Sequence, residues 1–186
     1  KVPNIKLMII GDGDYSAYQK LAQELGIAEQ VLFTGVQMNP FALLAKADVY
    51  ALTSDSEGFP NALIEAMAVG LPCVSVNCKT GPAEILQNDY QQCAAQDKVY
   101  HADYGILTPV FYGGKNLDAS MISQEEEIFA GELVELLLNQ KLMASYRNKA
   151  LYRANQFGVD AYVREIDRLI VQELEWPEVE NVGQQE

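Results

Sequence analysis

Basic residues are scarce in this chain of 186 residues, which contains 13 lysines and arginines against 26 aspartates and glutamates. The formal net charge of −13 argues against nonspecific binding to nucleic acid and provides no basic face for anionic lipids. This charge does not exclude a local anion site, because backbone N–H groups at the start of a helix can hold a phosphate by themselves.

Metal-binding and disulfide-forming residues are scarce as well. The chain has one histidine, His101, and three cysteines, Cys73, Cys78 and Cys93, with no C-x-x-C spacing. These residues are too few and too loosely spaced for a zinc site, and an odd number of cysteines fits reduced cytosolic thiols better than a disulfide scaffold. We therefore expect no metal and a cytoplasmic location.

Long apolar runs are also missing. No stretch approaches the ~20 residues of a membrane span, and no signal peptide is visible. Hydrophobic residues make up 49% of the chain and charged residues 21%. This composition and length are typical of a soluble globular domain with a substantial core.

Strand and helix patterns alternate along the chain. The apolar run from Ile5 to Ile10 ends at Gly11 and predicts a buried strand followed by a tight turn. Residues 15–25 repeat apolar side chains at helical spacing and stop at Gly26. We expect further strands at 31–33, 49–52, 73–76 and 105–107, and helices at 41–45, 61–69, 125–138, 141–155 and 161–174, with the Tyr and Leu stripes of the last helices in the core. This alternation predicts an α/β fold whose parallel sheet has helices on both faces.

Ligands of such folds bind at the carboxyl ends of the strands. Three segments follow predicted strands: the turn Gly11-Asp12-Gly13, the loop from Thr53 to Asn61, and the loop from Asn77 to Pro82. We expect the three segments to converge on one crevice, although they are far apart in the sequence.

The second of these segments contains two glutamates, Glu57 and Glu65, with seven residues between them. Pro60 stands where a helix would begin, since its missing N–H costs nothing at a first helical position. Glu57 therefore lies in the loop, and Glu65 lies on an otherwise apolar helix, where burial of its carboxylate would be costly without partners. Backbone N–H groups near Gly58 and Phe59 would point out of the helix start and provide a phosphate site.

The stretch E-G-F-P-N-A-L-I-E-A-M-A at residues 57–68 resembles the E-x7-E motif of retaining glycosyltransferases of the GT-B type, family 4, also called glycosyl transferases group 1. In that family the first glutamate reaches the donor sugar, the loop backbone holds the diphosphate, and the second glutamate binds the ribose hydroxyls. The resemblance assigns the first role, which is the catalytic one, to Glu57 and the third to Glu65. It assigns the diphosphate to Gly58, Phe59, Pro60 and Asn61.

Other segments resemble the same family in the same order. I-K-L-M-I-I-G-D-G at residues 5–13 is similar to the strand and glycine turn that open the donor half, which implies donor contacts at Gly11 and Gly13. V-L-F-T-G at 31–35 is similar to the next strand, after which Gln37 and Met38 would meet the base. Later landmarks are A-D-V-Y-A-L-T-S, G-L-P-C-V-S, G-P-A-E-I-L and Y-G-I-L-T-P, between residues 47 and 109.

The resemblance implies the C-terminal half of a GT-B fold: a Rossmann-like donor-binding domain over residues 1–174, with a flexible acidic tail at 175–186. The family's N-terminal acceptor domain and the upstream Arg and Lys that clamp the diphosphate are not in this sequence. We therefore expect a fragment that binds nucleotide weakly and does not turn over by itself.

The implied reaction transfers a sugar from a UDP- or GDP-linked donor to a sugar or a lipid-linked sugar, in bacterial polysaccharide or glycolipid assembly. It needs no metal or other cofactor and involves no nucleic acid. Any peripheral attachment to the inner face of the membrane would come from the N-terminal domain, which is also an expected partner.

Two rival hypotheses remain. A sugar-nucleotide 2-epimerase shares the GT-B architecture, but its acidic and histidine catalytic groups are not found here. The second rival is a non-catalytic module, either a nucleotide-binding or scaffold domain or a receiver-like domain. The receiver-like domain would use Asp12, Asp55 and Lys79, but it leaves the two glutamates unexplained. The D-x-D spacing of Asp12 and Asp14 is interpreted as a turn and a helix cap rather than a metal site.

Overall fold

The computed structural model describes residues 2–93, 97–111, 117–118 and 120–174. The predicted tail, 175–186, lies outside the described residues. In chain order the elements are β1 (Leu7–Ile9), α1 (Ser16–Glu24), η1 (Ala28–Gln30), β2 (Val31–Phe33), α2 (Phe41–Leu44), β3 (Tyr50–Leu52), α3 (Asn61–Ala68), β4 (Cys73–Val76), α4 (Pro82–Leu86), η2 (Tyr90–Cys93), β5 (Tyr100–His101), β6 (Ile106–Thr108), α5 (Gln124–Leu138), α6 (Gln140–Asn155) and α7 (Val159–Leu174). This order confirms the predicted α/β class.

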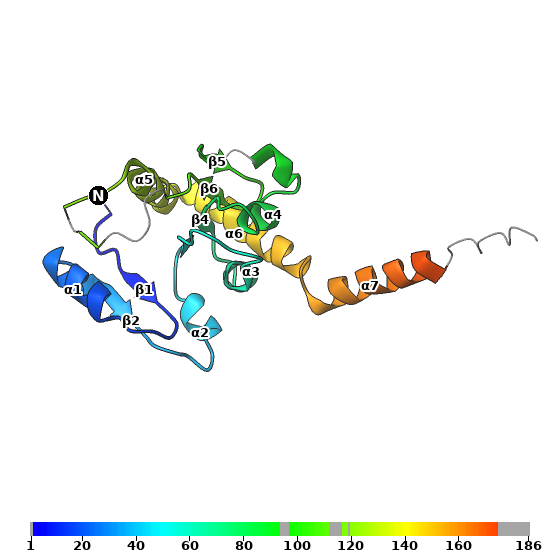
Figure 1. Cartoon of the computed structure of the whole chain (residues 1–186), viewed down its shortest axis with the longest axis horizontal. Coiled ribbons are helices and arrows are strands. Elements are labelled where there is room, and N and C mark those ends of the chain that lie inside the picture. Colours follow the sequence, from blue (N-terminus) through cyan, green and yellow to red (C-terminus); the bar gives the residue numbers. More distant parts are fainter. Residues whose placement is uncertain (1, 94–96, 112–116, 119, 175–186) are drawn as a thin grey trace, which may run out of the picture.

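The strands form two separate sheets. β1 and β2 pair in parallel, and β3, β4, β6 and β5 form a second sheet in that order. Its first three strands are parallel, whereas β5 pairs antiparallel with β6. The edge strands are β1 and β2 in the first sheet and β3 and β5 in the second, and none of them has a further pairing partner among the described residues. Figure 1 shows the β1–α1–β2 unit beside the second sheet rather than joined to it.

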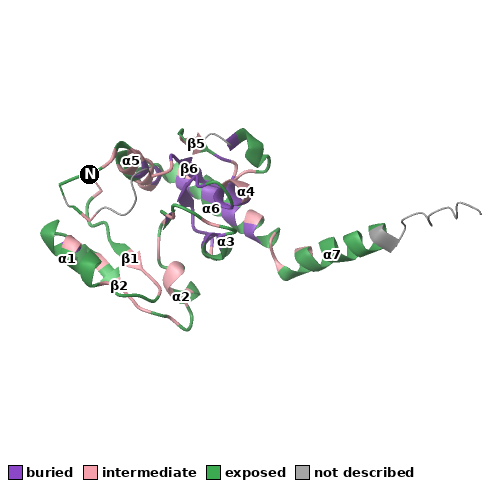
Figure 2. Ribbon diagram, viewed as in Figure 1, coloured by how far each residue is buried: buried purple, intermediate pink, exposed green. Residues whose placement is uncertain are grey.

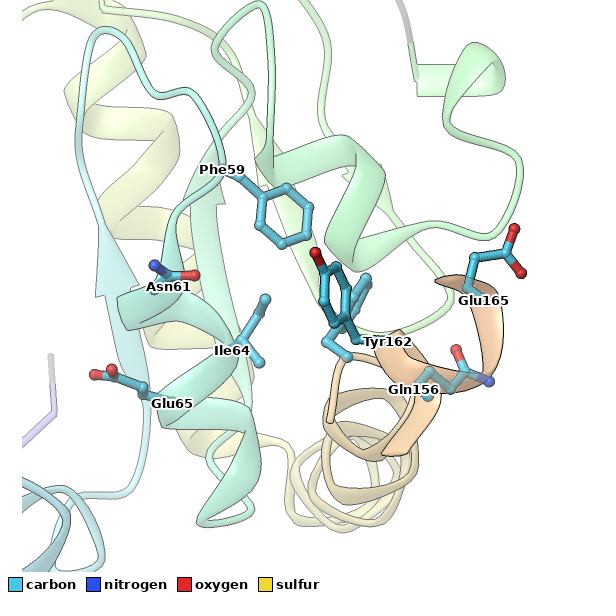
Figure 3. Close-up of a pocket in the computed structure, with 9 residues that line it drawn as sticks. Phe59, Asn61, Ile64, Glu65, Gln156, Tyr162 and Glu165 are labelled. Atoms are coloured by element: carbon cyan, nitrogen blue, oxygen red, sulfur yellow. The ribbon is translucent and has the colours of Figure 1, made fainter. Parts of the chain in front are cut away.

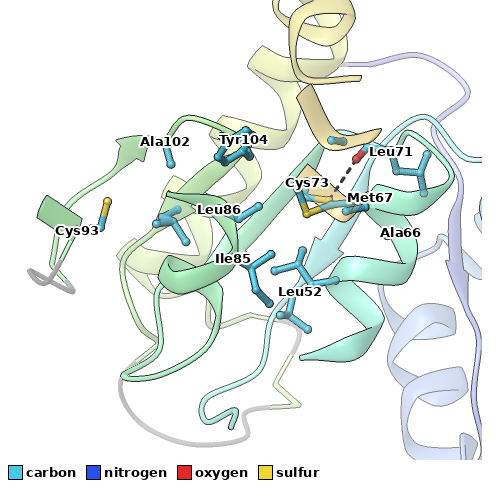
Figure 4. Close-up of a cluster of buried hydrophobic side chains, with 14 residues drawn as sticks. Leu52, Ala66, Met67, Leu71, Cys73, Ile85, Leu86, Cys93, Ala102 and Tyr104 are labelled. Atoms are coloured by element: carbon cyan, nitrogen blue, oxygen red, sulfur yellow. Dashed lines mark hydrogen bonds between the residues drawn. The ribbon is translucent and has the colours of Figure 1, made fainter. Parts of the chain in front are cut away.

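The second sheet is covered on both faces, because side chains alternate along its central strands. Cys73 of β4 and Leu107 of β6 belong to a core cluster that also contains α3, α4 and the later part of α6 (Figure 4). Val74 follows Cys73, and Ile106 precedes Leu107, so both point to the opposite face of the sheet. They belong to a second cluster beneath α5 and the first part of α6. The long helix α6 therefore contributes to both clusters.

The two ends of the described chain are much less buried (Figure 2). Leu7 and Leu32, in the small sheet, are each about half exposed. The predicted burial of the apolar stripe on the last helix is wrong, because α7 projects away from the sheets (Figures 1 and 2). Its exposed apolar side chains are Val159, Tyr162, Val163, Ile166, Leu169, Ile170 and Val171. None of the helices in the described part of the chain is both long and apolar enough to span a bilayer.

Helix α5 offers a matched test of the second core cluster. Leu136 is fully buried, whereas Leu138 on the same helix is 61% exposed. We expect Leu136→Ala to lower the free energy of unfolding by about 2–5 kcal/mol, because it removes buried methyl groups and leaves a cavity. Urea denaturation measures the change. Leu138→Ala should stay within about 0.5 kcal/mol of the wild type, and equal effects from both would contradict the described packing.

Candidate functional site

A loop joins the carboxyl end of β3 to α3 and contains Glu57; we call residues 53–60 the glutamate loop. Pro60 has an extended backbone (φ −72°, ψ 93°) and precedes the first helical residue, Asn61. The prediction that Pro60 takes the first helical position is therefore wrong by one residue. No side chain caps this end of α3. The Leu63 N–H donates to the Pro60 carbonyl oxygen, whereas the N–H groups of Asn61 and Ala62 have no acceptor among the described residues and can meet an anion.

The two glutamates differ in burial. Glu57 is half-buried within the glutamate loop, whereas Glu65 is exposed on α3. Leu63 and Met67 occupy the buried side of the helix, and Asn61 lies on the exposed side with Glu65. Because Glu65 is exposed, its carboxylate does not bear the cost of burial that the sequence suggested. Within the described residues it makes no hydrogen bond or ion pair. Its oxygens are available to a ligand.

Tyr50 of β3 lies close to both glutamates. Burial raises the pKa of the Tyr50 phenol to about 12, and the Cys73 thiol and the carboxylates of Glu57 and Glu65 raise it further. The phenol, which is protonated at neutral pH in any case, therefore stays protonated in alkaline solution as well.

The predicted meeting of the glutamate loop with the loop from Asn77 to Pro82 is confirmed. The Thr80 hydroxyl donates a hydrogen bond to the Glu57 carbonyl oxygen. Gly81 has φ +94°, and a Cβ placed there would lie 2.5 Å from Cδ of Pro60 and 2.8 Å from the carbonyl oxygen of Gly58. The two backbones approach so closely that only glycine fits at this position.

The remaining predicted donor residues belong to the small sheet. Gly11 donates a backbone hydrogen bond to Gly35, which ties the turn after β1 to the end of β2. Gln37 donates to the Thr34 carbonyl oxygen over 2.7 Å, and Met38 is fully exposed. No hydrogen bond within the described residues joins this group to the glutamate loop, so the convergence of all three segments on one crevice is not seen.

The Asp12-Gly13-Asp14 segment forms the predicted turn, but the predicted N-cap is wrong, because Tyr15 is the N-cap residue of α1 and its side chain makes no capping hydrogen bond. The Asp12 carboxylate accepts the Gly13 N–H, and the Asp14 carboxylate accepts the Ser16 N–H at the start of α1. The bond from Ser16 lowers the pKa of Asp14. No cluster of three or more His, Cys, Asp or Glu side chains suited to a metal ion occurs in the described part of the chain.

A groove of about 480 Å³ lies beside α3, between this helix and the junction of α6 with α7 (Figure 3). Figure 3 shows Phe59 and Tyr162 on facing sides of this groove, whereas Glu65 points away from Tyr162. Its lining residues are Phe59, Asn61, Ile64, Glu65, Gln156, Phe157, Ala161, Tyr162 and Glu165. The lining residues after 155 are not among the predicted site residues, which end at Glu65.

The family model described as glycosyl transferases group 1 matches residues 1–102. Among curated proteins, the chain is 34% identical over 174 residues to an uncharacterized glycosyltransferase of Methanocaldococcus jannaschii, covering 91% of this chain and 43% of that protein. It is 41% identical over 91 residues to lipopolysaccharide 1,6-galactosyltransferase of Escherichia coli, covering 46% of this chain and 25% of that protein. The chain thus spans less than half the length of these relatives.

Among solved structures, the chain is similar to Anabaena HepE in complex with UDP. The TM-score is 0.69 at 22% identity, covering 92% of this chain and 42% of that one. At this identity the likeness shows a shared fold.

The close approach at Gly81 can be tested by adding a single methyl group. We expect Gly81→Ala to lower the free energy of unfolding by about 1–3 kcal/mol, because alanine is strained at this φ and its Cβ collides with Pro60 and Gly58. Thermal or urea unfolding measures the loss, and amide chemical shifts of residues 57–61 should move with it. Gly131→Ala is the control, because a Cβ there meets nothing within 4 Å and α5 should gain up to about 1 kcal/mol. Unchanged stability and shifts in Gly81→Ala would contradict the contact.

Proposed function

The chain belongs to the glycosyl transferases group 1 family, and from this premise we propose that residues 1–174 are the donor-binding domain of a retaining glycosyltransferase. The proposed reaction moves a sugar from a nucleotide diphosphate sugar to an acceptor hydroxyl and keeps the anomeric configuration. The observation that carries the proposal is the position of the segment from Glu57 to Glu65. It lies at the carboxyl end of β3, where α/β folds of this kind bind ligands.

In this proposal, different residues of the segment bind different parts of the donor. The exposed Glu65 carboxylate accepts hydrogen bonds from the vicinal ribose hydroxyls. The N–H groups of the glutamate loop and the first turn of α3 hold the diphosphate, helped by the positive end of the helix dipole. Glu57 orients the donor sugar and steadies positive charge that develops at the anomeric carbon.

The small sheet supplies the base side of the proposed site. Gly11 and Gly13 provide a close-approaching turn, and Gln37 and Met38 follow β2, near the expected position of the base. Because Met38 is fully exposed, its side chain is available to cover a flat heterocycle. The four residues contact the donor once the small sheet lies beside the glutamate loop.

The open edges of β1 and β3 support a contribution from another segment. The observed orders, β2-β1 and β3-β4-β6, match the doubly wound order 3-2-1-4-5-6 if the first of its six strands is left out. A strand between β1 and β3 would join the sheets, and we propose that a preceding segment provides it. An N-terminal domain of the same enzyme would provide the acceptor contacts and any attachment to the membrane.

The relatives guide the choice of substrates. The HepE structure is a complex with UDP, and the E. coli relative is named for a lipopolysaccharide galactosyltransferase. We therefore place a UDP-linked sugar first and a GDP-linked sugar second as donor, with a glycan or lipid-linked glycan as acceptor in bacterial polysaccharide assembly. The proposed chemistry uses no metal and takes place in the cytoplasm.

Ligand-observed NMR of the chain with UDP, GDP, ADP and NAD tests the donor site. We expect saturation transfer to the ribose and base of one nucleoside diphosphate. Glu65→Ala should weaken that binding by about tenfold or more, because each ribose hydroxyl loses a charged acceptor. Glu29→Ala removes an exposed glutamate near the opposite end of β2 and should leave binding unchanged.

If no nucleotide shows saturation transfer, the same titration is repeated with the longer enzyme, where the diphosphate clamp is expected. Silence there as well would contradict the donor site, and so would equal binding by the wild type and Glu65→Ala.

Glu57 and Glu65 should separate in the kinetics of the longer enzyme. We expect Glu57→Ala to lower kcat by about 10²-fold, because the developing charge at the anomeric carbon loses its stabilising carboxylate. Glu65→Ala should chiefly raise KM for the donor. Steady-state rates at varied donor concentration distinguish the two effects. Negligible effects from both substitutions would overturn the assignment.

A further inference from the structure

A series of ring contacts leads away from the glutamate loop. The Phe59 ring meets the Phe157 ring edge-on, with centroids 5.5 Å apart and planes at 69°. The guanidinium carbon of Arg153 lies 4.8 Å from the centroid of Phe157 and 4.9 Å from that of Tyr104. We call these four side chains the aromatic ladder. It connects the proposed donor site to the end of α6.

The arginine of the ladder is fixed to the end of α4. Arg153 Nε donates to the Ile85 carbonyl oxygen and Nη2 donates to the Glu84 carbonyl oxygen, each over 2.8 Å. Carbonyl groups in the last turn of a helix lack partners within the helix, so a charged side chain that reaches them is a strong anchor. Burial lowers the pKa of Arg153, but an arginine side chain stays charged.

The ladder and the contact at Gly81 hold the glutamate loop from two sides. α4 begins at Pro82, directly after the glycine that meets Gly58 and Pro60. The same helix ends at the carbonyls that bind Arg153. The contacts therefore form a ring: the glutamate loop meets Gly81 before α4, α4 binds Arg153, Arg153 packs on Phe157, and Phe157 packs on Phe59 of the same loop. Displacing the loop must break either the backbone contact or the ring contact.

The ring contact matters because the middle of the glutamate loop is exposed to solvent. Gly58 and Phe59 are exposed, and a Cβ added to Gly58 would meet nothing within 4 Å. Phe59 has the largest side chain of the glutamate loop. Among the described residues its one ring partner is Phe157. Removing that partner leaves the glutamate loop held from the Thr80–Gly81 side alone.

We propose that Phe157 and Arg153 are positioning residues for the donor site. They hold Phe59, and with it the backbone from Glu57 to Asn61, in the conformation that receives the donor. They act through the loop and do not touch the reacting atoms. The benefit to donor binding rests on the proposed function, whereas the hold on the loop does not depend on it.

Amide hydrogen exchange in the 186-residue chain tests the hold. We expect Phe157→Leu to speed exchange of the Leu63 amide, which donates to the Pro60 carbonyl oxygen of the glutamate loop over 3.0 Å, by about 3- to 10-fold, the factor that corresponds to one edge-on aromatic pair. Amides of β4 should be unaffected. Phe157→Tyr keeps the ring and should restore the wild-type exchange rates, which a general loss of stability would not explain.

Tyr152→Leu is the matched control. The Tyr152 ring lies on α6 next to Arg153, is 63% exposed and stacks on Tyr104 at 6.5 Å. No ring contact joins it to Phe59 within the described residues. Its removal should leave exchange in the loop at the wild-type rate. Equal exchange rates in Phe157→Leu, Tyr152→Leu and the wild type would contradict the positioning role.

If Phe157→Leu does not fold, Phe59→Leu tests the same contact from its exposed end. It should speed exchange at the Phe157 and Gly158 amides and shift the Arg153 Nε–H signal. No change at either position would overturn the proposal.

A titration with UDP separates this proposal from the proposed function. The variant Phe157→Leu should weaken UDP binding, by no more than the factor by which loop exchange accelerates, because only molecules in the held conformation bind. If the wild type binds no UDP, the exchange result still decides the hold, while the donor assignment is decided by the titrations with the other nucleotides and with the longer enzyme. If the wild type binds UDP and Phe157→Leu changes neither exchange nor affinity, the positioning role fails and the donor assignment stands.

Discussion

The close approach of two backbones at Gly81 is the constraint on which the site depends. Thr80 binds the carbonyl of Glu57, and Gly81 leaves no room between itself and the glutamate loop. Because α4 starts at the next residue and its Ile85 and Leu86 are fully buried, this contact is continuous with the core. The loop is exposed to ligand on one side and tied to the most buried part of the molecule on the other. Preorganisation of this kind is what a binding loop needs, since ordering it on binding would cost affinity.

The electrostatics of the site follow from the same arrangement. A chain with a net charge of −13 has no excess of cations to attract a diphosphate, so in the proposed role the anion relies on N–H groups at the start of α3. The carboxylate of Glu65 lies on the exposed side of the helix, where hydroxyl groups rather than phosphates can approach it. Burial raises the pKa of the Tyr50 phenol to about 12, so this side chain stays neutral even well above neutral pH and does not compete with the two carboxylates that have a proposed use.

The sequence predicted what depends on local pattern and missed what depends on distant contacts. The periodicity of residues 125–155 predicted α5 and α6 to within a residue at either end, and the alternation of elements predicted the α/β class. α4 was missed because five residues are too few to show a helical period. The exposure of Glu65 and the division into two sheets could not be read from the sequence, because both depend on which segments pair. The contact of Phe59 with Phe157 joins a loop to a helix end far along the chain, and no short motif encodes such a pair.

The division of the sheet has a consequence for affinity. Glu57 and Glu65 belong to the second sheet, whereas Gln37 and Met38 follow β2 in the small sheet. A donor that contacts all four residues must hold the two sheets in one relative position, although their facing edges share no strand pairing in the described residues. If only a fraction of molecules has the competent arrangement, the apparent Kd rises by the inverse of that fraction. A strand that pairs with both β1 and β3 would remove this penalty before the donor arrives. Such a strand would therefore strengthen donor binding even if none of its side chains touched the nucleotide.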